Sequence, residues 1–363
     1  MCSITPAKAA GDTDAANMGA GPIASLAAHA ACTCGIDIHA HVVPHDFPRY
    51  LPQPDLPGWP SMAPAQACHR HVMIDGKNYR TVSDRCWDAP KRLADMDGMG
   101  LTLQVISPMP ELFSYWLPAA PAAELLRYIN DVIAEMVQGS QGRLCGLGAV
   151  PLQDMDLAVA ELHRLRGMGF AGVEIGSNVN GRPIGAPEFL PFFTEADRLG
   201  AAVFVHAVRP AGMDRLVGPR QLQQVLAYPT DIGLAAASVL TGNLMQVLPG
   251  LRIAFSHGGG TLGLLLPRLE QAMQVFAPVR EAVHASPTAQ ARRLFFDTLV
   301  FDTPTLRHLV GLFGADQVMI GTDYPFNFSD STPVARIEAA FDDPAIRERL
   351  LHGNARRFLG LPA

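Results

Sequence analysis

Short apolar runs alternate with helical patterns along most of the chain. The apolar runs span residues 35–42, 101–107, 144–150, 172–177, 202–207, 252–258, 294–299 and 318–324. Between them apolar residues recur at helical spacing, as in residues 121–142, and segments 156–169 and 188–200 each end in Gly, as helices often do. Eight strands, nearly all followed by a helix, predict an α/β fold over residues 35–363, a (β/α)8 TIM-type barrel.

A doubly wound open sheet is the rival fold. It would leave fewer strands whose carboxyl ends converge on one point. The first strand is followed by no GxGxxG motif, and the chain contains no Walker loop. The pattern therefore favours the barrel over a nucleotide-binding sheet.

Residues 44–87 interrupt the alternation of strands and helices. The segment is crowded with Pro and holds no long helical pattern. Long loops inside a compact domain are usually functional, and this one follows the first strand, on the face where barrel enzymes assemble their sites. We therefore expect a loop insertion that acts as a lid and contacts the substrate.

Composition narrows the classes of protein. Among 363 residues, 48% are hydrophobic and 17% charged, which allows a large buried core, and the net charge of −6 gives no basic surface for nucleic acid or anionic membranes. No apolar run approaches the roughly 20 residues that span a bilayer. Residues 1–34 lack the features of a signal peptide and predict a flexible extension on a cytoplasmic protein, with Cys32 and Cys34 as reduced thiols.

Polar residues occur where several predicted strands end. His39 and His41 lie two apart on the first strand, so they point to one side. His206, His257 and Asp323 end the fifth, sixth and eighth strands. Each alone is typical of a hydrogen-bonded core residue or a turn, but five at the same mouth of a barrel favour a metal site. A second HxH, His69 and His71, has no apolar strand before it and indicates surface histidines.

This pattern of HxH, His, His and Asp resembles the amidohydrolase superfamily, which implies a distorted barrel holding one or two divalent metals. Two-metal members usually bridge their ions with a carboxylated lysine on strand four. The only lysines here are Lys8, Lys77 and Lys91, while strand four carries Glu174, which faces either the helices or the site. One metal ion is therefore expected, with the ligands His39, His41, His206 and Asp323. Zinc is the first choice for this ion, and manganese and iron remain alternatives. His257 would be the base beside it.

A closer resemblance is to the aminocarboxymuconate-semialdehyde decarboxylases. It rests on "GKNYR", "CWDAPKRLADMDGMGLTLQVIS", "FSYW", "FSHGGGTLGLLLPR" and "GTDYPF", in that order. It implies non-oxidative loss of CO₂ from an unsaturated or aromatic acid, in the catabolism of such compounds. Arg80 and Arg268 would hold substrate carboxylates, with Arg268 supplied across a homodimer interface. Trp87 and Phe326, in the same segments, are expected to contact the substrate.

The implied mechanism begins when His257 takes a proton from metal-bound water. The resulting hydroxide, held by the four ligands, attacks the conjugated acid, and CO₂ leaves as the carbon is protonated. Asp323 is expected to act both as a ligand and as a catalytic residue. After His206 the chain reads "HAVRPAGMDR" where that family typically has "HPWDM". The change makes Arg209 and Arg215 candidates to contact a second anionic group. A hydrolase of a lactone, amide or ester, a hydratase of an unsaturated acid and an inactive binding scaffold remain as alternatives.

Overall fold

Eight parallel strands form the centre of the molecule in the computed structural model, which describes residues 35–362. In spatial order they are β1 (Gly35–Val42), β5 (Leu101–Pro108), β6 (Leu144–Gly148), β7 (Gly172–Gly176), β10 (Ala202–His206), β11 (Arg252–Phe255), β12 (Phe295–Asp297) and β13 (Val318–Met319). The backbone N–H groups of Ile38 and His41 donate to the carbonyls of Ile320 (2.9 Å) and Tyr324 (2.7 Å), so the last strand returns to the first. The predicted barrel is confirmed over the open sheet. The predicted extension 1–34, with Cys32 and Cys34, lies outside the described residues.

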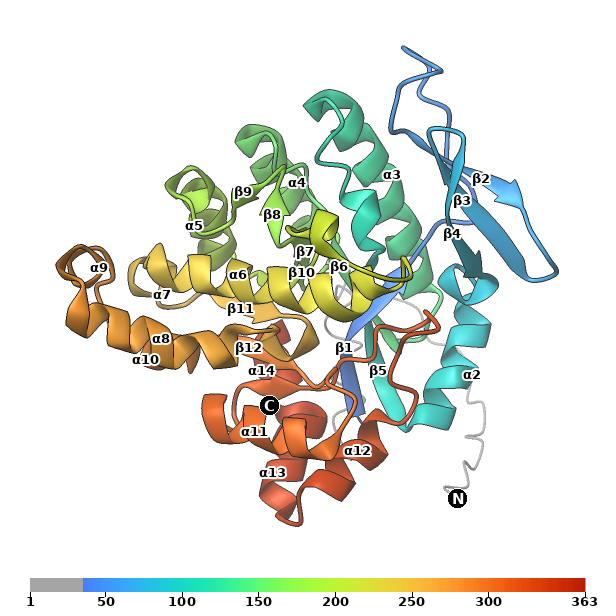
Figure 1. Cartoon of the computed structure of the whole chain (residues 1–363). Coiled ribbons are helices and arrows are strands. Elements are labelled where there is room, and N and C mark those ends of the chain that lie inside the picture. The colour runs from blue at the N-terminus through green and yellow to red at the C-terminus, as the bar shows by residue number, and fades with distance from the viewer. Residues whose placement is uncertain (1–34, 363) are drawn as a thin grey trace, which may run out of the picture.

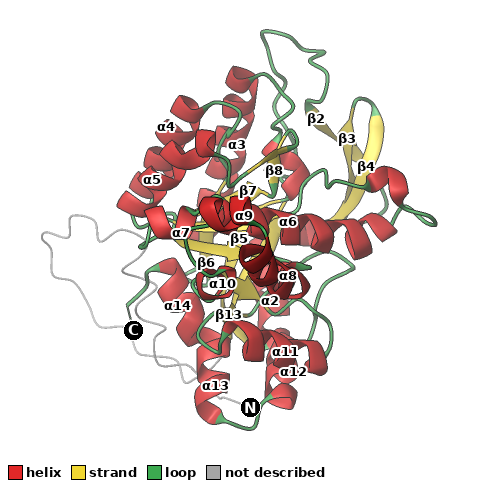
Figure 2. Ribbon diagram, turned by 60° about the vertical axis from the view of Figure 1, so that its left-hand side comes forward, coloured by secondary structure: helices red, strands yellow, loops and turns green. Residues whose placement is uncertain are grey.

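Helices surround this barrel (Figures 1 and 2). Those between successive barrel strands are α2 (Ala89–Met99), α3 (Ala119–Gln138), α4 (Met155–Gly167), α5 (Leu190–Arg198), α6 (Tyr228–Thr241), α7 (Leu244–Val247), α8 (Leu262–Val275), α9 (Ala277–Ala282), α10 (Pro287–Ala291) and α11 (Thr303–Phe313). Three more, α12 (Pro333–Ala340), α13 (Pro344–Glu348) and α14 (Asn354–Leu359), follow β13, and a hairpin of β8 (Asn178–Val179) and β9 (Arg182–Pro183) follows β7. In α3, Leu125, Ile129 and Ile133 are fully buried, as the helical spacing predicted.

The insertion between residues 44 and 87 is not the loop that the sequence indicated. It contains a three-stranded antiparallel sheet, β2 (Pro60–Pro64), β3 (His69–Ile74) and β4 (Lys77–Ser83), which projects from the barrel near α2 and α3 (Figure 1). The turn between β3 and β4 is Asp75-Gly76, with positive φ angles of 50° and 69°. An Asp-Gly pair favours this tight hairpin turn because both residues tolerate a left-handed backbone. The sheet carries Tyr79 and Arg80 on β4.

A β-bulge in β1 decides which of its side chains reach the barrel mouth. Asp37 pairs with Gln104 of β5 and Ala40 with Ile106, so three steps along β1 match two along β5. The extra residue interrupts the alternation of faces. The carboxylate of Asp37 accepts hydrogen bonds from Gln104 Nε2 (2.9 Å) and Thr322 Oγ1 (2.7 Å). The rings of His39 and His41 instead both lie against that of His206, with centroids 5.0 Å apart in each case.

The described part of the chain contains no helix that is long and apolar enough to cross a membrane.

Candidate metal centre

Four side chains converge at the carboxyl ends of the barrel strands. One ligand atom from each of His39, His41, His206 and Asp323 lies within 4.8 Å of the others. His41 Nε2 is 3.1 Å from His39 Nε2 and 3.0 Å from Asp323 Oδ1, and His39 Nε2 is 3.7 Å from that oxygen. Ligands bound to one ion at about 2.0–2.1 Å lie roughly 3.0–3.4 Å apart, so the two shorter distances match a shared metal ion and the third is longer.

The buried nitrogen of His206 supports the same interpretation. Its Nε2 atom has no hydrogen-bond partner among the described residues, although the side chain is almost fully buried. A buried polar atom without a partner is costly, and a metal ion would satisfy it. Three imidazoles and one carboxylate are donors that zinc, manganese and iron all accept. The donor set therefore fits one divalent ion.

Each histidine of the set is held through its other ring nitrogen. His39 Nδ1 lies 2.7 Å from Asp297 Oδ2 of β12, His41 Nδ1 lies 3.3 Å from the Pro108 carbonyl, and His206 Nδ1 lies 2.9 Å from the Ala207 carbonyl. Such contacts fix the tautomer, so that Nε2 faces the ion. The sequence pattern did not single out Asp297, although it too follows an apolar run, in "LFFDTL".

Replacing Asp297 by Asn should weaken metal binding about 10–100-fold, because His39 would lose the carboxylate that orients its ring and raises its basicity. The same carboxylate also accepts from the Gly258 amide (2.7 Å), which an amide oxygen can still do. Competition with a chromogenic chelator would measure the affinity, with the exposed Asp55→Asn as the control. Unchanged affinity would contradict the orienting role.

Burial sets the protonation of these groups. Burial lowers the pKa of His206 well below its usual range, and burial together with the neighbouring His39 lowers that of His257 to about 4. Both imidazoles are therefore neutral near pH 7, the form that can ligate a metal or accept a proton. Burial also lowers the pKa of His39, but the hydrogen bond to Asp297 and the charges of the nearby carboxylates, Asp323 among them, together outweigh it and raise the value to about 9. A metal therefore displaces a proton when it binds this ring.

His257 lies against the ligand set without belonging to it. Its ring centroid is 4.9 Å from that of His206 and 5.6 Å from that of His39. Its Nδ1 is 2.9 Å from the hydroxyl of Ser256, which leaves Nε2 as the nitrogen free to exchange a proton. This placement agrees with the role expected of a base beside the metal.

The backbone is strained at two of these positions. His257 and Asp323 have φ angles of 54° and 62°, in the left-handed region that residues other than Gly rarely adopt. Each such residue costs of the order of 1 kcal/mol, and strain of this kind concentrates at functional sites. Both strained residues here are ones that the sequence assigned to chemistry.

Glu174 of β7 faces the metal centre. It is fully buried, and its Oε2 atom is 3.9 Å from His41 Nδ1. Burial raises the pKa of this carboxyl to about 8. The carboxyl is therefore largely neutral near pH 7, and the nitrogen of His41 that it approaches is Nδ1.

Two of the expected substrate contacts lie beside the metal ligands. The guanidinium of Arg80 lies 4.2 Å above the ring of Phe326, which stacks on His41 at a centroid distance of 5.4 Å. A cavity of about 20 Å³ joins them to His206 and Asp323. Arg80 and Phe326 also line a wider groove of about 470 Å³, which borders β4 and the segment after β13.

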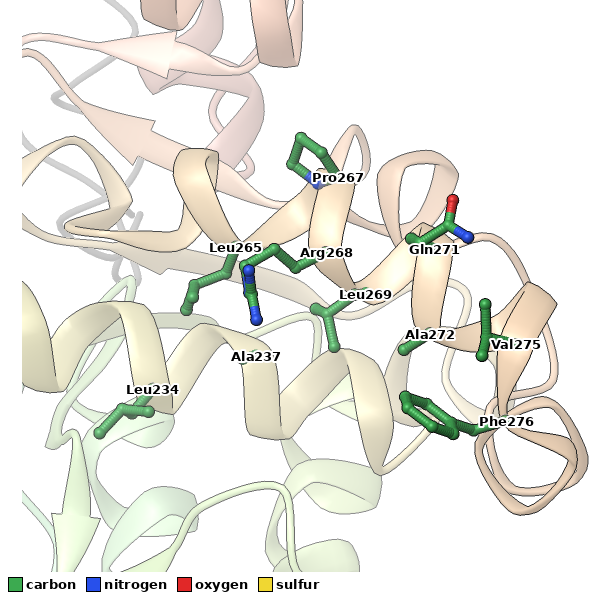
Figure 3. Close-up of a pocket in the computed structure, with 10 residues that line it drawn as sticks. All are labelled: Leu234, Ala237, Leu265, Pro267, Arg268, Leu269, Gln271, Ala272, Val275 and Phe276. Carbon is green, nitrogen blue, oxygen red and sulfur yellow. The ribbon is translucent and has the colours of Figure 1, made fainter.

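The other two expected contacts lie elsewhere. The ring of Trp87 packs against His45, with centroids 5.4 Å apart. Arg268 lies on the exposed side of α8, in a hollow that α8 forms with α6 (Figure 3). Neither residue lines the cavity at the metal ligands of its own chain.

Within residues 35–362 the second HxH motif belongs to no cluster of three or more potential metal ligands. His69 and His71 lie on β3, which corrects the expectation that no strand carries them. His71 Nδ1 contacts the hydroxyl of Thr81 at 2.8 Å, a cross-strand pair.

Comparison with known proteins identifies a family and several similar decarboxylases. The family model described as Amidohydrolase matches residues 36–361. A 2-amino-3-carboxymuconate-6-semialdehyde decarboxylase of Dictyostelium discoideum is 35% identical over 330 residues, covering 90% of this chain and 91% of that protein. A gamma-resorcylate decarboxylase of Rhizobium radiobacter is 26% identical over 310 residues, covering 79% of this chain and 92% of that protein.

A solved structure shares the fold. It is a dihydroxybenzoic acid decarboxylase from Polaromonas sp. with bound manganese and the inhibitor 2-nitroresorcinol. The two structures superpose with a TM-score of 0.71 at 20% sequence identity, covering 90% of this chain and 97% of that chain. The family model extends over nearly all of the described residues, including the four that form the candidate metal site, and the 35% identity covers 90% of the chain. The chain therefore belongs to the amidohydrolase family.

Proposed function

We propose that this protein is a metal-dependent carboxy-lyase that removes CO₂, without oxidation, from an aromatic or unsaturated carboxylic acid. The observation that carries the proposal is the position of Arg80. Its guanidinium lines the cavity at the metal ligands, and among residues 35–362 no carboxylate lies within ion-pair distance of it. A free guanidinium beside a metal centre is suited to a substrate carboxylate, whereas hydrolysis of a neutral ester or lactone needs none.

The reaction breaks the bond between the carboxylate and a carbon of the conjugated system. The electron pair of that bond stays on the carbon, which must then gain a proton. A bound divalent ion would supply a Lewis acid and acidify a coordinated water. His257 accepts at Nε2 a proton that comes from water and passes it to the carbon, so one solvent proton takes the place of the lost CO₂. Arg80 orients the carboxylate and Phe326 packs against the substrate.

Zinc is our first candidate for the ion. The three-nitrogen, one-oxygen donor set suits it, while manganese is the metal in the related structure described above, so both must be tested. Elemental analysis of the purified protein, followed by reconstitution of the metal-free protein with each ion, would show which one restores turnover.

The activity can be tested directly. Hydroxybenzoates and carboxymuconate semialdehydes should release CO₂ and lose their ultraviolet absorbance in step when the metal-loaded protein is added. Hydrolysis of lactones or esters without CO₂ release would favour the hydrolase, and loss of absorbance without CO₂ the hydratase.

We further propose that two chains assemble and that each lends Arg268 to the other's site. Arg268 is exposed in the hollow between α6 and α8, whose volume is about 690 Å³. Large apolar side chains line the same hollow with high exposure, Leu234 at 51%, Val275 at 60% and Phe276 at 57%. Such a patch is typical of a subunit interface, and an arginine within it would reach a neighbouring chain.

Mixing two inactive variants tests this sharing. Arg268→Ala and His257→Asn should each be nearly inactive, but heterodimers contain one site with both residues intact. If subunits exchange freely, an equal mixture should recover about a quarter of wild-type activity. Recovery would be followed by CO₂ release, with each variant mixed with itself as the control. No recovery from verified heterodimers would contradict the shared arginine.

A further inference from the structure

A buried carboxylate lies outside the ligand set and takes no part in the reaction as described so far. Asp231, in the first turn of α6, is 6% exposed. Three neutral groups donate hydrogen bonds to it, namely the Ser177 hydroxyl, Asn178 Nδ2 (3.2 Å) and the Ala211 backbone N–H (3.1 Å). Because an ionised carboxylate can only accept hydrogen bonds, this arrangement fits the anion.

An unbroken chain of hydrogen bonds leads from Asp231 to His206. The Ser177 hydroxyl that donates to Asp231 accepts the backbone N–H of Val208 (3.1 Å). The carbonyl of the same peptide, on Ala207, lies 2.9 Å from His206 Nδ1, and it accepts the proton of that nitrogen when Nε2 faces the ion. One peptide group thus connects the carboxylate, through a hydroxyl, to the ring of a metal ligand.

The backbone of two neighbouring strands fixes the direction of this peptide. Ser177 directly follows β7 and His206 ends β10, and the Ser177 N–H donates to the His206 carbonyl (2.8 Å). Asn178 Nδ2 donates to the Val208 carbonyl (2.9 Å). Ser177 is itself buried, so solvent does not compete for its hydroxyl. The chain of hydrogen bonds is therefore held in one geometry.

The peptide that holds His41 ends differently. His41 Nδ1 lies 3.3 Å from the Pro108 carbonyl, and the N–H of that peptide, on Met109, donates to the Val42 carbonyl (2.9 Å). That acceptor is neutral, whereas the chain behind His206 ends on an anion. Hydrogen bonds in series polarise one another, so the anion draws the Nδ1 proton of His206 toward its carbonyl acceptor and leaves Nε2 richer in electrons.

We propose that Asp231 is a positioning residue of the metal centre, which acts through Ser177 and the Ala207–Val208 peptide to orient His206 and to strengthen its bond to the ion. Asp231 does not line the cavity at the metal ligands, so it reaches the ion only through His206. The inference rests on the metal dependence in the proposed function, but it concerns ion binding and not the reaction that the ion serves.

Zinc affinity tests the proposal without turnover. Asp231→Asn should weaken zinc binding to the metal-free protein about 3–10-fold, less than the loss of a carboxylate that contacts a ligand directly, because each intervening bond attenuates the effect of the charge. Competition with a chromogenic chelator would measure the affinity. Glu161→Gln is the matched control, because Glu161 is also a buried carboxylate but pairs with Asn130 and Arg164 between helices, so its zinc affinity should stay unchanged.

Nuclear magnetic resonance distinguishes this role from a merely structural one. In the zinc-loaded protein with ¹⁵N-labelled histidine, the position of the His206 Nδ1 proton signal reports the strength of its hydrogen bond to Ala207. That signal should move upfield in Asp231→Asn, while the corresponding signal of His41 stays in place. Both signals moving together, with an altered circular dichroism spectrum, would indicate a general disturbance of the fold and would contradict the proposal.

A double-mutant cycle tests the route. Ser177→Ala breaks the chain and leaves Asp231 present, so it should weaken zinc binding as much as Asp231→Asn, and the double variant should bind zinc within about 2-fold of either single one. If the two losses multiply, or if Asp231→Asn binds zinc like the wild type, the proposal is wrong. If the cycle behaves as expected but no acid releases CO₂, the role of Asp231 stands and the proposed reaction fails.

Discussion

Replacing His206 by Ala is expected to remove both the metal and the activity. The Nε2 atom of this residue is buried and has no other partner in the described chain, so its only role would be to bind the ion. Loss of one ligand of four leaves a site that binds the ion weakly, and the Lewis acid supplies several kcal/mol of transition-state stabilisation. Turnover should therefore fall at least about 10³-fold.

Metal content distinguishes this result from simple misfolding. Wild-type protein should contain about one divalent ion per chain, and His206→Ala should contain almost none after dialysis, with an unchanged far-ultraviolet circular dichroism spectrum. His71→Ala, in the other HxH motif, is the matched control and should keep metal and activity, because its ring pairs with Thr81. Full metal content in His206→Ala, or wild-type turnover after chelation, would contradict the assigned centre.

The clustering of His39, His41, His206 and Asp323 was predictable because local patterns determine where these residues lie. Each follows an apolar run, and parallel strands of a barrel bring their carboxyl ends together, so sequence position alone placed His39, His206 and Asp323 at one mouth. The bulge between Asp37 and Ala40 was not predictable in this way. Simple alternation would put Asp37 on the same side as His39, but the extra residue turns it toward Gln104.

The errors have separate physical causes. The small sheet within residues 44–87 was overlooked because its many prolines obscured the alternation, although Asp75-Gly76 is a strong local signal for a hairpin. Asp297 carried the same strand-end signal as the ligands and was missed because it acts through His39.

Replacing His257 by Asn should lower kcat about 10²–10⁴-fold while the protein keeps its metal. Asn is similar in size and keeps a hydrogen-bonding group near Ser256, but its amide cannot accept and return a proton at neutral pH. Since His257 lies outside the ligand set, metal content should stay near one ion per chain, and KM should change far less than kcat.

A second variant separates proton transfer from orientation. Ser256→Ala removes only the hydroxyl beside Nδ1 and leaves the Nε2 base in place, so its kcat should fall much less, about 10-fold or under. With the metal retained in both variants, the difference between them measures what the imidazole contributes as a base. If His257→Asn loses its ion, this histidine is a fifth ligand. If His257→Asn keeps its ion and still turns over at the wild-type rate, His257 is not the group that transfers the proton.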